Sequence, residues 1–497
     1  MYHNIQQGLD QRDEIFILFC DISKAFDRTS HKGIINKLQK LGIQGSLLNW
    51  FKNYLSDRQQ RVVIEGQSSS WRSLQAGIPQ GSCLGPLLFI IFINDMGDNV
   101  VNDTYLFADD ATNVLISNDL RHFQVHIQTD ISNILSWGHK WAVTFSIAKT
   151  EYMIISRREN RSQLQLQLGN SQIDEAITHK HLGLFMNNKG TWHEHIIYII
   201  KKANLRLGIL KKLKYTCDRA TLLKLYVSYI RSILEYGDIV WDNISVELED
   251  RLERVQVDAL RCITGLTISS SRAALYAETG ILPLNKRRKI HRLVMFYRIL
   301  NGLAPTSLTA LVPNNNEQPR PYPTRNNLLT PFRCRTESFN KSFFPNTTRD
   351  WNALPAPIRV KPSVLTFKTA LLKTNDFRID KTPDWYNEGP RLENILLTRI
   401  RHSCSGLAQH LFAINVIDSP ICQNCGLNEI ESPDHFLLNC PKYVNSRNAM
   451  LANVRFVFQG HITSNLLLRG NQNLNRDTNK LILKAVCNFI KSTSRFT

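Results

Sequence analysis

Phe107-Ala108-Asp109-Asp110 decides the fold, because it places two adjacent carboxylates between two segments with strand character. Residues 104–107 precede the Asp pair and residues 112–116 follow it, and both are rich in the β-branched and aromatic residues that favour strands. The pattern predicts a β-hairpin with the Asp pair at its tip. Alone, an Asp-Asp dipeptide is more typical of a polar turn than of a catalytic site.

A second acidic motif, Phe19-Cys20-Asp21-Ile22-Ser23-Lys24-Ala25-Phe26-Asp27, comes earlier in the chain. Residues 14–20 form a short apolar run that predicts a strand ending at Asp21. If this strand neighbours the hairpin, Asp21 meets Asp109 and Asp110. Phosphoryl transfer to a hydroxyl uses two divalent cations about 3.5–4 Å apart, and Mg²⁺ prefers oxygen ligands. The three carboxylates therefore predict a site for two Mg²⁺ ions, with Mn²⁺ as an alternative.

A glycine-rich loop lies between the two acidic motifs. Residues 76–89 read Ala-Gly-Ile-Pro-Gln-Gly-Ser-Cys-Leu-Gly-Pro-Leu-Leu-Phe. Its glycines let the backbone approach a ligand closely, and Pro79 stiffens the turn. Gln80 carries a side chain that can reach a base or a sugar. A Gly/Pro loop alone is usually just a loop, so the signal lies in the order and spacing of the three motifs.

The hydrophobic pattern changes along the chain. Residues 1–175 mix strand-like and helix-like segments, which predicts an α/β or α+β layer, and apolar residues from Leu120 to Leu135 predict an amphipathic helix packed on a sheet. Residues 196–305 are helical in pattern, and residues 313–331 are a Pro- and Asn-rich linker. Two apolar stripes predict helix-bundle core: Leu222, Tyr226, Tyr229, Ile230 and Ile233, and Leu248, Leu252, Val255 and Ala259.

The net charge narrows the classes of partner. The chain has 61 Lys+Arg against 42 Asp+Glu, a formal charge of +19. Such a field attracts polyanions, so nucleic acid is the first candidate and an anionic membrane surface the second. The longest apolar run, residues 87–93, is far too short to cross a bilayer, and no secretory signal is evident, so we expect no membrane partner. Ten cysteines with one cluster indicate a reducing compartment and one metal site.

That cluster is Cys422, Cys425, His435 and Cys440, with the spacing C-x2-C-x9-H-x4-C. Three thiolates and an imidazole satisfy a closed, structural Zn²⁺ site. In a small module the metal supplies most of the folding free energy, on the order of 10 kcal/mol. Such knuckles usually bind nucleic acid. Residues 426–434 are acidic, however, so a structural zinc without RNA contact stays open.

Taken in order, the motifs resemble the palm of reverse transcriptases from non-LTR (LINE-type, jockey-like) retrotransposons. The matching segments are FCDISKAFD at residues 19–27, AGIPQGSCLGPLLFIIFIND at 76–95 and FADD at 107–110. Residues 144–150 resemble the motif that follows, and His181-Leu182-Gly183 with residues 192–195 resembles the primer-grip region. The helical segment and the Cys/His cluster extend the resemblance over most of the chain.

The resemblance implies an α+β fold: a right-hand polymerase palm with an antiparallel sheet and packed helices, a helical thumb-like region, and a small C-terminal zinc-knuckle domain. The palm would occupy residues 1–175 with its fingers largely missing, and the primer-grip and thumb-like region residues 176–305. A linker at 306–335 and a small segment of unknown role at 336–380 would precede the C-terminal domain at 381–497.

The same resemblance assigns roles at the catalytic centre. Asp21, Asp109 and Asp110 would hold the Mg²⁺ ions. Lys149 matches a lysine that serves as general acid on the pyrophosphate, with an exposed surface lysine as the alternative. Asp27 fits the motif but is expected to cap a helix rather than to bind metal.

The resemblance also assigns nucleotide contacts. Phe26 would be the steric gate that fills the space of a ribose 2′-hydroxyl, with a core Phe as the alternative. Lys24 and Ala25 would present backbone N–H groups to the triphosphate, and Gln80 and Gly81 would line the incoming nucleotide.

The implied activity is RNA-directed DNA polymerisation, with an RNA template, a DNA primer or target and deoxynucleoside triphosphates as partners. The implied location is intracellular, in the nucleus or cytoplasm as a ribonucleoprotein. Only residues 1–20 precede Asp21, and no endonuclease is present, so we expect an N-terminally truncated copy that binds deoxynucleotide poorly. One alternative is a catalytically inactive nucleic-acid-binding remnant. Another is an RNA-dependent RNA polymerase, which Phe26 disfavours.

Overall fold

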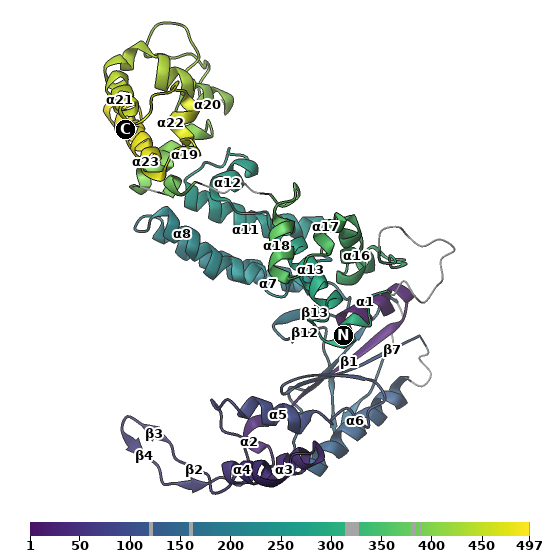
Figure 1. Cartoon of the computed structure of the whole chain (residues 1–497). Coiled ribbons are helices and arrows are strands. Elements are labelled where there is room, and N and C mark those ends of the chain that lie inside the picture. Colours follow the sequence, from purple (N-terminus) through teal and green to yellow (C-terminus); the bar gives the residue numbers. More distant parts are fainter. Residues whose placement is uncertain (119–122, 159–162, 314–327, 379–382, 388, 497) are drawn as a thin grey trace. The chain divides into compact units, whose positions relative to one another are not determined.

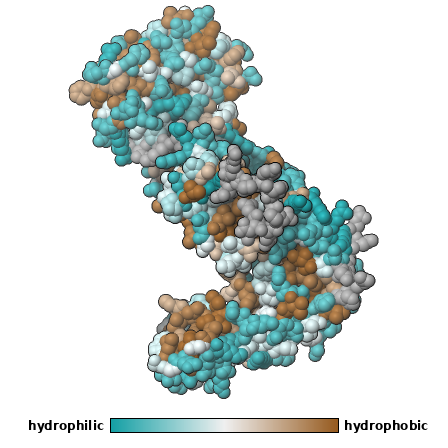
Figure 2. All heavy atoms as spheres, turned by 45° about the vertical axis from the view of Figure 1, so that its right-hand side comes forward, coloured by the Kyte–Doolittle hydropathy of each residue, from teal (hydrophilic) through white to brown (hydrophobic). Residues whose placement is uncertain are grey.

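The computed structural model describes residues 1–118, 123–158, 163–313, 328–378, 383–387 and 389–496. It divides into two compact units, the first made of residues 1–195 and 331–346, the second of residues 196–330 and 347–497. The limits of these units do not coincide with the domain boundaries expected at 175 and 305. No helix among the described residues combines the length and the apolar character that crossing a bilayer requires. The face in Figure 2 mixes hydrophilic and hydrophobic residues.

The first unit is a mixed helix and sheet structure built around strand β1, Glu14–Asp21. Five strands are arranged in the order β11-β8-β1-β7-β6, which makes β1 the central strand; Figure 1 labels β1 and β7 of this sheet. Its neighbours β7 (Asp110–Ser117) and β8 (Glu151–Ile155) both run antiparallel to it. Strand β6 (Asp103–Phe107) pairs antiparallel with β7, and β11 (Asp174–Glu175) runs parallel to β8. The apolar run of residues 15–20 is buried throughout, as expected for a strand covered on both faces.

Helices cover the two faces of this sheet. One face packs its alternate residues, including Phe16, Leu18 and Cys20, into a core shared with α3 (His31–Lys40), α5 (Gly85–Ile93) and α6 (Phe123–Trp141). The predicted amphipathic helix is therefore present as α6, while Leu120 lies outside the described residues. Helix α1 (Tyr2–Gln11) approaches the sheet through Gly8, where an added Cβ would lie 2.7 Å from the Ile116 side chain.

Short elements complete the first unit. The hairpin of β12 and β13 turns at Leu182 and Gly183, both with positive φ. Residues 335–336 join α1 because their backbone N–H groups donate to the Asp10 carboxylate, at 2.6–3.0 Å. The remaining elements are α2 Ala25–Arg28, α4 Gly45–Leu55, β2 Gln59–Gln60, β3 Val63–Ile64, β4 Gln67–Ser68, β5 Arg72–Ser73, β9 Gln167–Leu168, β10 Ser171–Gln172, β12 Thr178–His181, β13 Leu184–Asn187 and α15 Glu337–Asn340.

The second unit is helical in its described part. Its first helices are α7 His193–Leu213, α8 Arg219–Leu225, η1 Tyr226–Arg231, α9 Ser232–Leu234, α10 Asp238–Trp241, α11 Val246–Thr264, α12 Arg272–Thr279, α13 Leu284–Leu300 and α14 Thr306–Thr309. These are followed by α16 Phe343–Ala353, α17 Ala356–Arg359 and α18 Val364–Leu372. Trp351, to which the sequence assigned no role, is a core residue in contact with the rings of Phe296 and Phe367.

One of the two predicted apolar stripes is partly wrong. The stripe on α11 is buried at all four positions. On the preceding segment, Tyr229 is exposed instead of buried, and Leu234 rather than Ile233 continues the buried face. The reason is η1, a π-helix whose wider turn places buried residues four apart, at Tyr226 and Ile230.

A second core lies in the C-terminal part of this unit. Its elements are η2 Asp384–Asn387, α19 Arg391–Arg401, α20 Ala408–Ala413, η3 His435–Asn439, η4 Pro441–Tyr443, α21 Val444–Val457, α22 Ser464–Arg469 and α23 Arg476–Thr493. Buried residues of α19, α21, α22 and α23 share one cluster with Cys422 and Cys440. A buried carboxylate links this core to α8 and α12: Glu278 binds the guanidinium groups of Arg219 and Arg401, at 2.7 and 2.6 Å.

Candidate active site and metal centre

Strand register brings the first and last carboxylates of the predicted site together. Asp21 is paired directly with Asp110 across the antiparallel β1·β7 ladder, so both side chains lie on the same face of the sheet. Phe107 pairs with Asp110, which leaves Ala108 and Asp109 as a two-residue turn. The predicted hairpin is therefore present, with Asp109 at its tip.

The turn stores conformational strain beside the carboxylates. Ala108 has a φ of 52°, a left-handed conformation that residues with a Cβ rarely adopt. Such outliers persist where the surrounding structure imposes them, often at functional sites. Here the two flanking strands fix the turn length, and the strain is the consequence of closing it with two residues.

The three carboxylates repel one another. Burial, then the charges of Asp109 and Asp21, raises the pKa of Asp110 above its usual value. A bound cation would offset this repulsion and lower the pKa of Asp110, so the group of carboxylates is suited to hold one. The carboxylate oxygens are ligands of the kind that Mg²⁺ prefers.

Lys149 reaches the site from a loop held against β1. Ser23 N donates to Thr144 O at 2.9 Å, and Ser146 N donates to Asp21 O at 2.8 Å. These backbone bonds place Lys149 Nζ 3.3 Å from the Asp21 carboxylate, while the side chain stays largely exposed. The position agrees with a proton donor near the metals, but its general-acid role stays a prediction.

A cavity of about 220 Å³ opens beside these groups. Its lining residues are Phe19, Cys20, Asp21, Asp110, Ala111, Thr112, Lys149, His179, Lys180 and His181. Strand β12 supplies the last three. The ring of His179 stacks on Phe19 with centroids 3.6 Å apart, and its Nδ1 contacts the Glu151 carboxylate. Burial, then the neighbouring His179, lowers the pKa of His181 to about 4, so it is neutral at pH 7.

Sequence reasoning missed His179 and Lys180. It singled out His181-Leu182-Gly183, two residues further along the same hairpin. An alternating pattern across residues 178–181 was the available signal, because residues 179 and 181 fall on one face of a strand. Nothing in the sequence indicated that this face meets the end of β1.

The glycine-rich loop lies against the segment that carries Phe26. Gly77 has a φ of 97°, and a Cβ there would lie 2.8 Å from the backbone oxygen of Asp27, so only glycine fits. Ile78 N donates to Phe26 O at 2.8 Å. Gln80 Nε2 donates to the Asp27 carboxylate at 3.1 Å. The structure thus brings the two segments together, while the nucleotide contacts of Gln80 and Gly81 stay predictions.

The predicted helix cap at Asp27 is wrong. Helix α2 begins at Ala25, and its N-cap residue is Lys24, which has a left-handed backbone conformation with a φ of 50°. Asp27 lies inside the helix. Its carboxylate accepts from Gln80 instead. Phe26 is half-buried, and its ring stacks on Phe89 with centroids 4.8 Å apart. This packing agrees with the alternative in which Phe26 is a core residue, and the steric-gate role stays a prediction.

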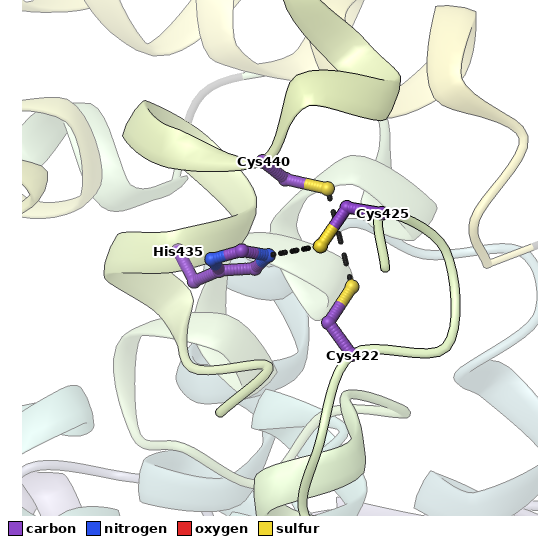
Figure 3. Close-up of side chains that lie close together, drawn as sticks. All are labelled: Cys422, Cys425, His435 and Cys440. Carbon is purple, nitrogen blue, oxygen red and sulfur yellow. Dashed lines mark hydrogen bonds between the residues drawn. The ribbon is translucent and has the colours of Figure 1, made fainter. Parts of the chain in front are cut away.

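The Cys/His cluster forms a second centre, shown in Figure 3. One ligand atom from each of Cys422, Cys425, His435 and Cys440 lies within 4.8 Å of every other. Cys422 Sγ and Cys440 Sγ are 3.9 Å apart, and Cys425 Sγ is 3.4 Å from His435 Nε2. Tetrahedral Zn²⁺ with its usual bond lengths requires about 3.8 Å between sulfurs and about 3.6 Å between sulfur and nitrogen. The four residues therefore fit zinc.

Neighbouring groups prepare this centre for a cation. His435 Nδ1 lies 2.7 Å from Glu429 Oε2, a contact that leaves Nε2 to face the sulfurs. Burial, then the thiol of Cys422, raises the pKa of Cys440 to about 12, a state that a bound cation would reverse. The acidic loop thus has structural partners: Glu429 orients the histidine, and buried Glu431 pairs with Arg495 at 2.7 Å.

The Cys/His cluster belongs to a larger helical core rather than to a small module. Cys422 and Cys440 are buried in the same apolar cluster as α21 and α23. A metal here would fasten one edge of a helical core rather than supply most of the folding free energy of a separate module.

Residues 3–189 match the family model described as "Reverse transcriptase (RNA-dependent DNA polymerase)". The probable RNA-directed DNA polymerase from transposon BS of Drosophila melanogaster is 26% identical over 276 residues, which cover 52% of this chain and 30% of that protein. The RNA-directed DNA polymerase from mobile element jockey of the same species is 25% identical over 272 residues, covering 52% and 29%.

A solved structure of apo telomerase from Candida tropicalis aligns with 58% of this chain and 47% of its own, at 12% identity and a TM-score of 0.33. That score is too low to support an argument about the fold. The match with this chain spans under a third of the length of each of the two Drosophila relatives.

Charge repulsion predicts a stability effect at Asp110. Because the folded pKa of this acid is raised, its ionisation at neutral pH costs folding free energy, and that cost is lost as the pH falls through the folded pKa to below the unfolded pKa. Asp110→Asn should therefore raise the Tm of metal-free protein at pH 7.5 by a few degrees at most, since the side chain is partly solvated. The gain should vanish in acid.

Thermal unfolding of both proteins across this pH range, with the exposed Asp98→Asn as control, measures the effect. A lower Tm for Asp110→Asn without metal at neutral pH would contradict the repulsion argument.

The Cys/His cluster predicts about one zinc per chain by elemental analysis. Glu429→Gln should weaken zinc binding by about 10–100-fold, because the carboxylate that orients His435 is lost. Asp434→Asn removes an exposed charge from the same loop and should change the affinity less than twofold. Competition with a chromophoric chelator gives both numbers, and equal effects of the two variants would reject the orienting role.

Proposed function

We propose that residues 3–189, a reverse transcriptase domain of the jockey-like non-LTR retrotransposon kind, extend a DNA primer by copying an RNA template. The observation that carries the proposal is the direct pairing of Asp21 with Asp110 beside the Asp109 turn. Two carboxylates on one face of a sheet, with a third in the adjoining turn, are a suitable ligand set for the cations of nucleotidyl transfer.

Two Mg²⁺ ions would supply charge neutralisation at the attacking oxygen and at the leaving pyrophosphate. The role of the chain itself is to hold their ligands at fixed positions. Asp21 is fixed by the β1·β7 ladder and by the backbone bond from Ser146. Lys149, whose Nζ lies 3.3 Å from the Asp21 carboxylate, would give a proton to the leaving group or attract it electrostatically.

The incoming deoxynucleoside triphosphate would lie against the surface formed by Phe26 and the loop of Gln80 and Gly81. The half-buried ring of Phe26 is braced from behind by Phe89, so it cannot easily move away from a bulky sugar. A braced ring excludes a ribose 2′-hydroxyl by volume alone. This supports DNA rather than RNA synthesis.

The primer would approach from the β12–β13 hairpin. Its residues 179–181 line the cavity next to Asp21 and Asp110, and Lys180 contributes positive charge there. A cation beside the reactive carboxylates would hold the phosphate of the primer end.

Primer extension on an RNA template with Mg²⁺ tests the function. Asp109→Asn should lower the extension rate at least a thousandfold, about 4 kcal/mol of transition-state stabilisation, with template binding nearly unchanged. Deoxynucleotides should be used in preference to ribonucleotides, and Phe26→Ala should reduce this preference while Phe26→Tyr retains it. Normal extension by Asp109→Asn would rule out the assigned site, and equal use of both nucleotides by the parent chain would rule out the sugar gate.

A further inference from the structure

A cleft with a volume of about 930 Å³ lies within the second unit, and its lining shares no residue with the carboxylate site. Residues 273–286, from α12 to the start of α13, form one side. Residues 458–473, which include α22 and the loop after it, form another, and Tyr386 contributes to the lining. Neither the polymerase site nor the zinc centre uses this cleft.

The cleft is positively charged. Its described lining includes the cationic side chains of Lys286, Arg378 and Arg469. Glu278 is the acidic residue of that lining, and it is already neutralised by Arg219 and Arg401. An anion entering the cleft therefore meets cations without a competing free carboxylate, which favours a phosphate-bearing ligand.

The loop of residues 470–473 is held in one shape. Gly470 has a φ of 72°, and a Cβ there would lie 2.3 Å from Asn479 Oδ1. Asn479 is completely buried, and it accepts from Asn471 N at 2.8 Å and donates to Asn471 O at 2.9 Å. Trp385 Nε1 donates to Arg469 O at 3.0 Å. These hydrogen bonds hold the loop of residues 470–473 in one conformation. A ligand that binds to this loop therefore pays a smaller entropy cost for ordering it.

The lining of the cleft also includes amide side chains and aromatic rings. Gln472 and Asn473 are exposed on the lining, and amide side chains can both donate to and accept from base edges. Tyr276 and Tyr386 are held in place, the first by its hydroxyl bond to Glu253 at 2.6 Å, the second by the Arg401 guanidinium 3.6 Å over its ring. Tyr386 is buried beneath that guanidinium, so the half-buried ring of Tyr276 is the one on which an unpaired base could stack, with its edge exposed to the amides.

We propose that this cleft binds single-stranded RNA, with Lys286 and Arg469 contacting phosphates and Gln472 and Asn473 contacting bases. Paired bases would hide both the faces and the edges that these groups address. The proposal depends on the proposed function only for the choice of RNA over other single strands. It adds a second nucleic-acid site to the chain.

Fluorescence anisotropy with a labelled oligouridylate tests the site. The full, zinc-loaded chain carries Asp109→Asn so that binding is measured apart from polymerisation. Lys286→Ala with Arg469→Ala should weaken binding at least tenfold near physiological salt, and should reduce the slope of log affinity against log salt by about 1.4, the value for two phosphate contacts on a single strand.

Two matched pairs complete the experiment. Lys368→Ala with Lys373→Ala removes the same charge from exposed positions outside the cleft and should change affinity less than twofold. Gln472→Ala with Asn473→Ala should weaken binding severalfold without changing the salt slope, because no charge is lost.

Several outcomes overturn the proposal. If the double variant at Lys286 and Arg469 and the control at Lys368 and Lys373 lost equal affinity, the binding would reflect only a diffuse positive field. Equal binding of duplex RNA, with no effect at Gln472 and Asn473, would reject single-strand recognition. Stronger competition by polyglutamate than by oligouridylate would identify an acidic protein partner instead. A chain that fails to extend primers but shows the expected binding pattern would refute the polymerase proposal and leave the cleft intact.

Discussion

The register between β1 and β7 is the constraint on which the rest of the first unit depends. Pairing Asp21 with Asp110 places both carboxylates on one face at the same end of the sheet. A slip of one residue would send one of them to the opposite face, into the core lined by α5 and α6. The buried residues 15–20 fix the register, because alternate side chains of this strand must face the apolar core on one side of the sheet, and a slip would turn them away from it. Helix packing thus determines where the charges meet.

This arrangement opposes local stability. Like charges raise the pKa of Asp110, and Ala108 occupies a backbone conformation suited to glycine. The Cys/His cluster shows the same pattern, since burial and neighbouring thiols raise the pKa of Cys440. Both sites therefore gain from a cation more than an ordinary surface would. The cleft in the second unit differs, because its buried carboxylate is already paired with two arginines and cationic side chains contribute to its lining.

The parts of the molecule that follow from local chemistry could be predicted from sequence. The strand ending at Asp21, the hairpin around Asp109 and the grouping of the four Cys/His ligands depend on short-range patterns. Contacts between distant segments could not be predicted. His179 stacks on Phe19, Gln80 binds Asp27, and residues 335–336 bind Asp10 of α1. The two partners of each contact are far apart in the sequence, and no periodic pattern connects them. Tyr229 was misplaced because a π-helix alters the period itself.

Cation binding by the three carboxylates is the central claim, and Mn²⁺ titration followed by electron paramagnetic resonance of the free ion tests it most directly. The zinc-loaded chain should show saturable Mn²⁺ binding that Asp21→Asn and Asp110→Asn each weaken strongly and that Asp98→Asn leaves unchanged. Unaltered binding in both site variants would contradict the account, because the register of β1 and β7 would then bring together carboxylates that hold no metal.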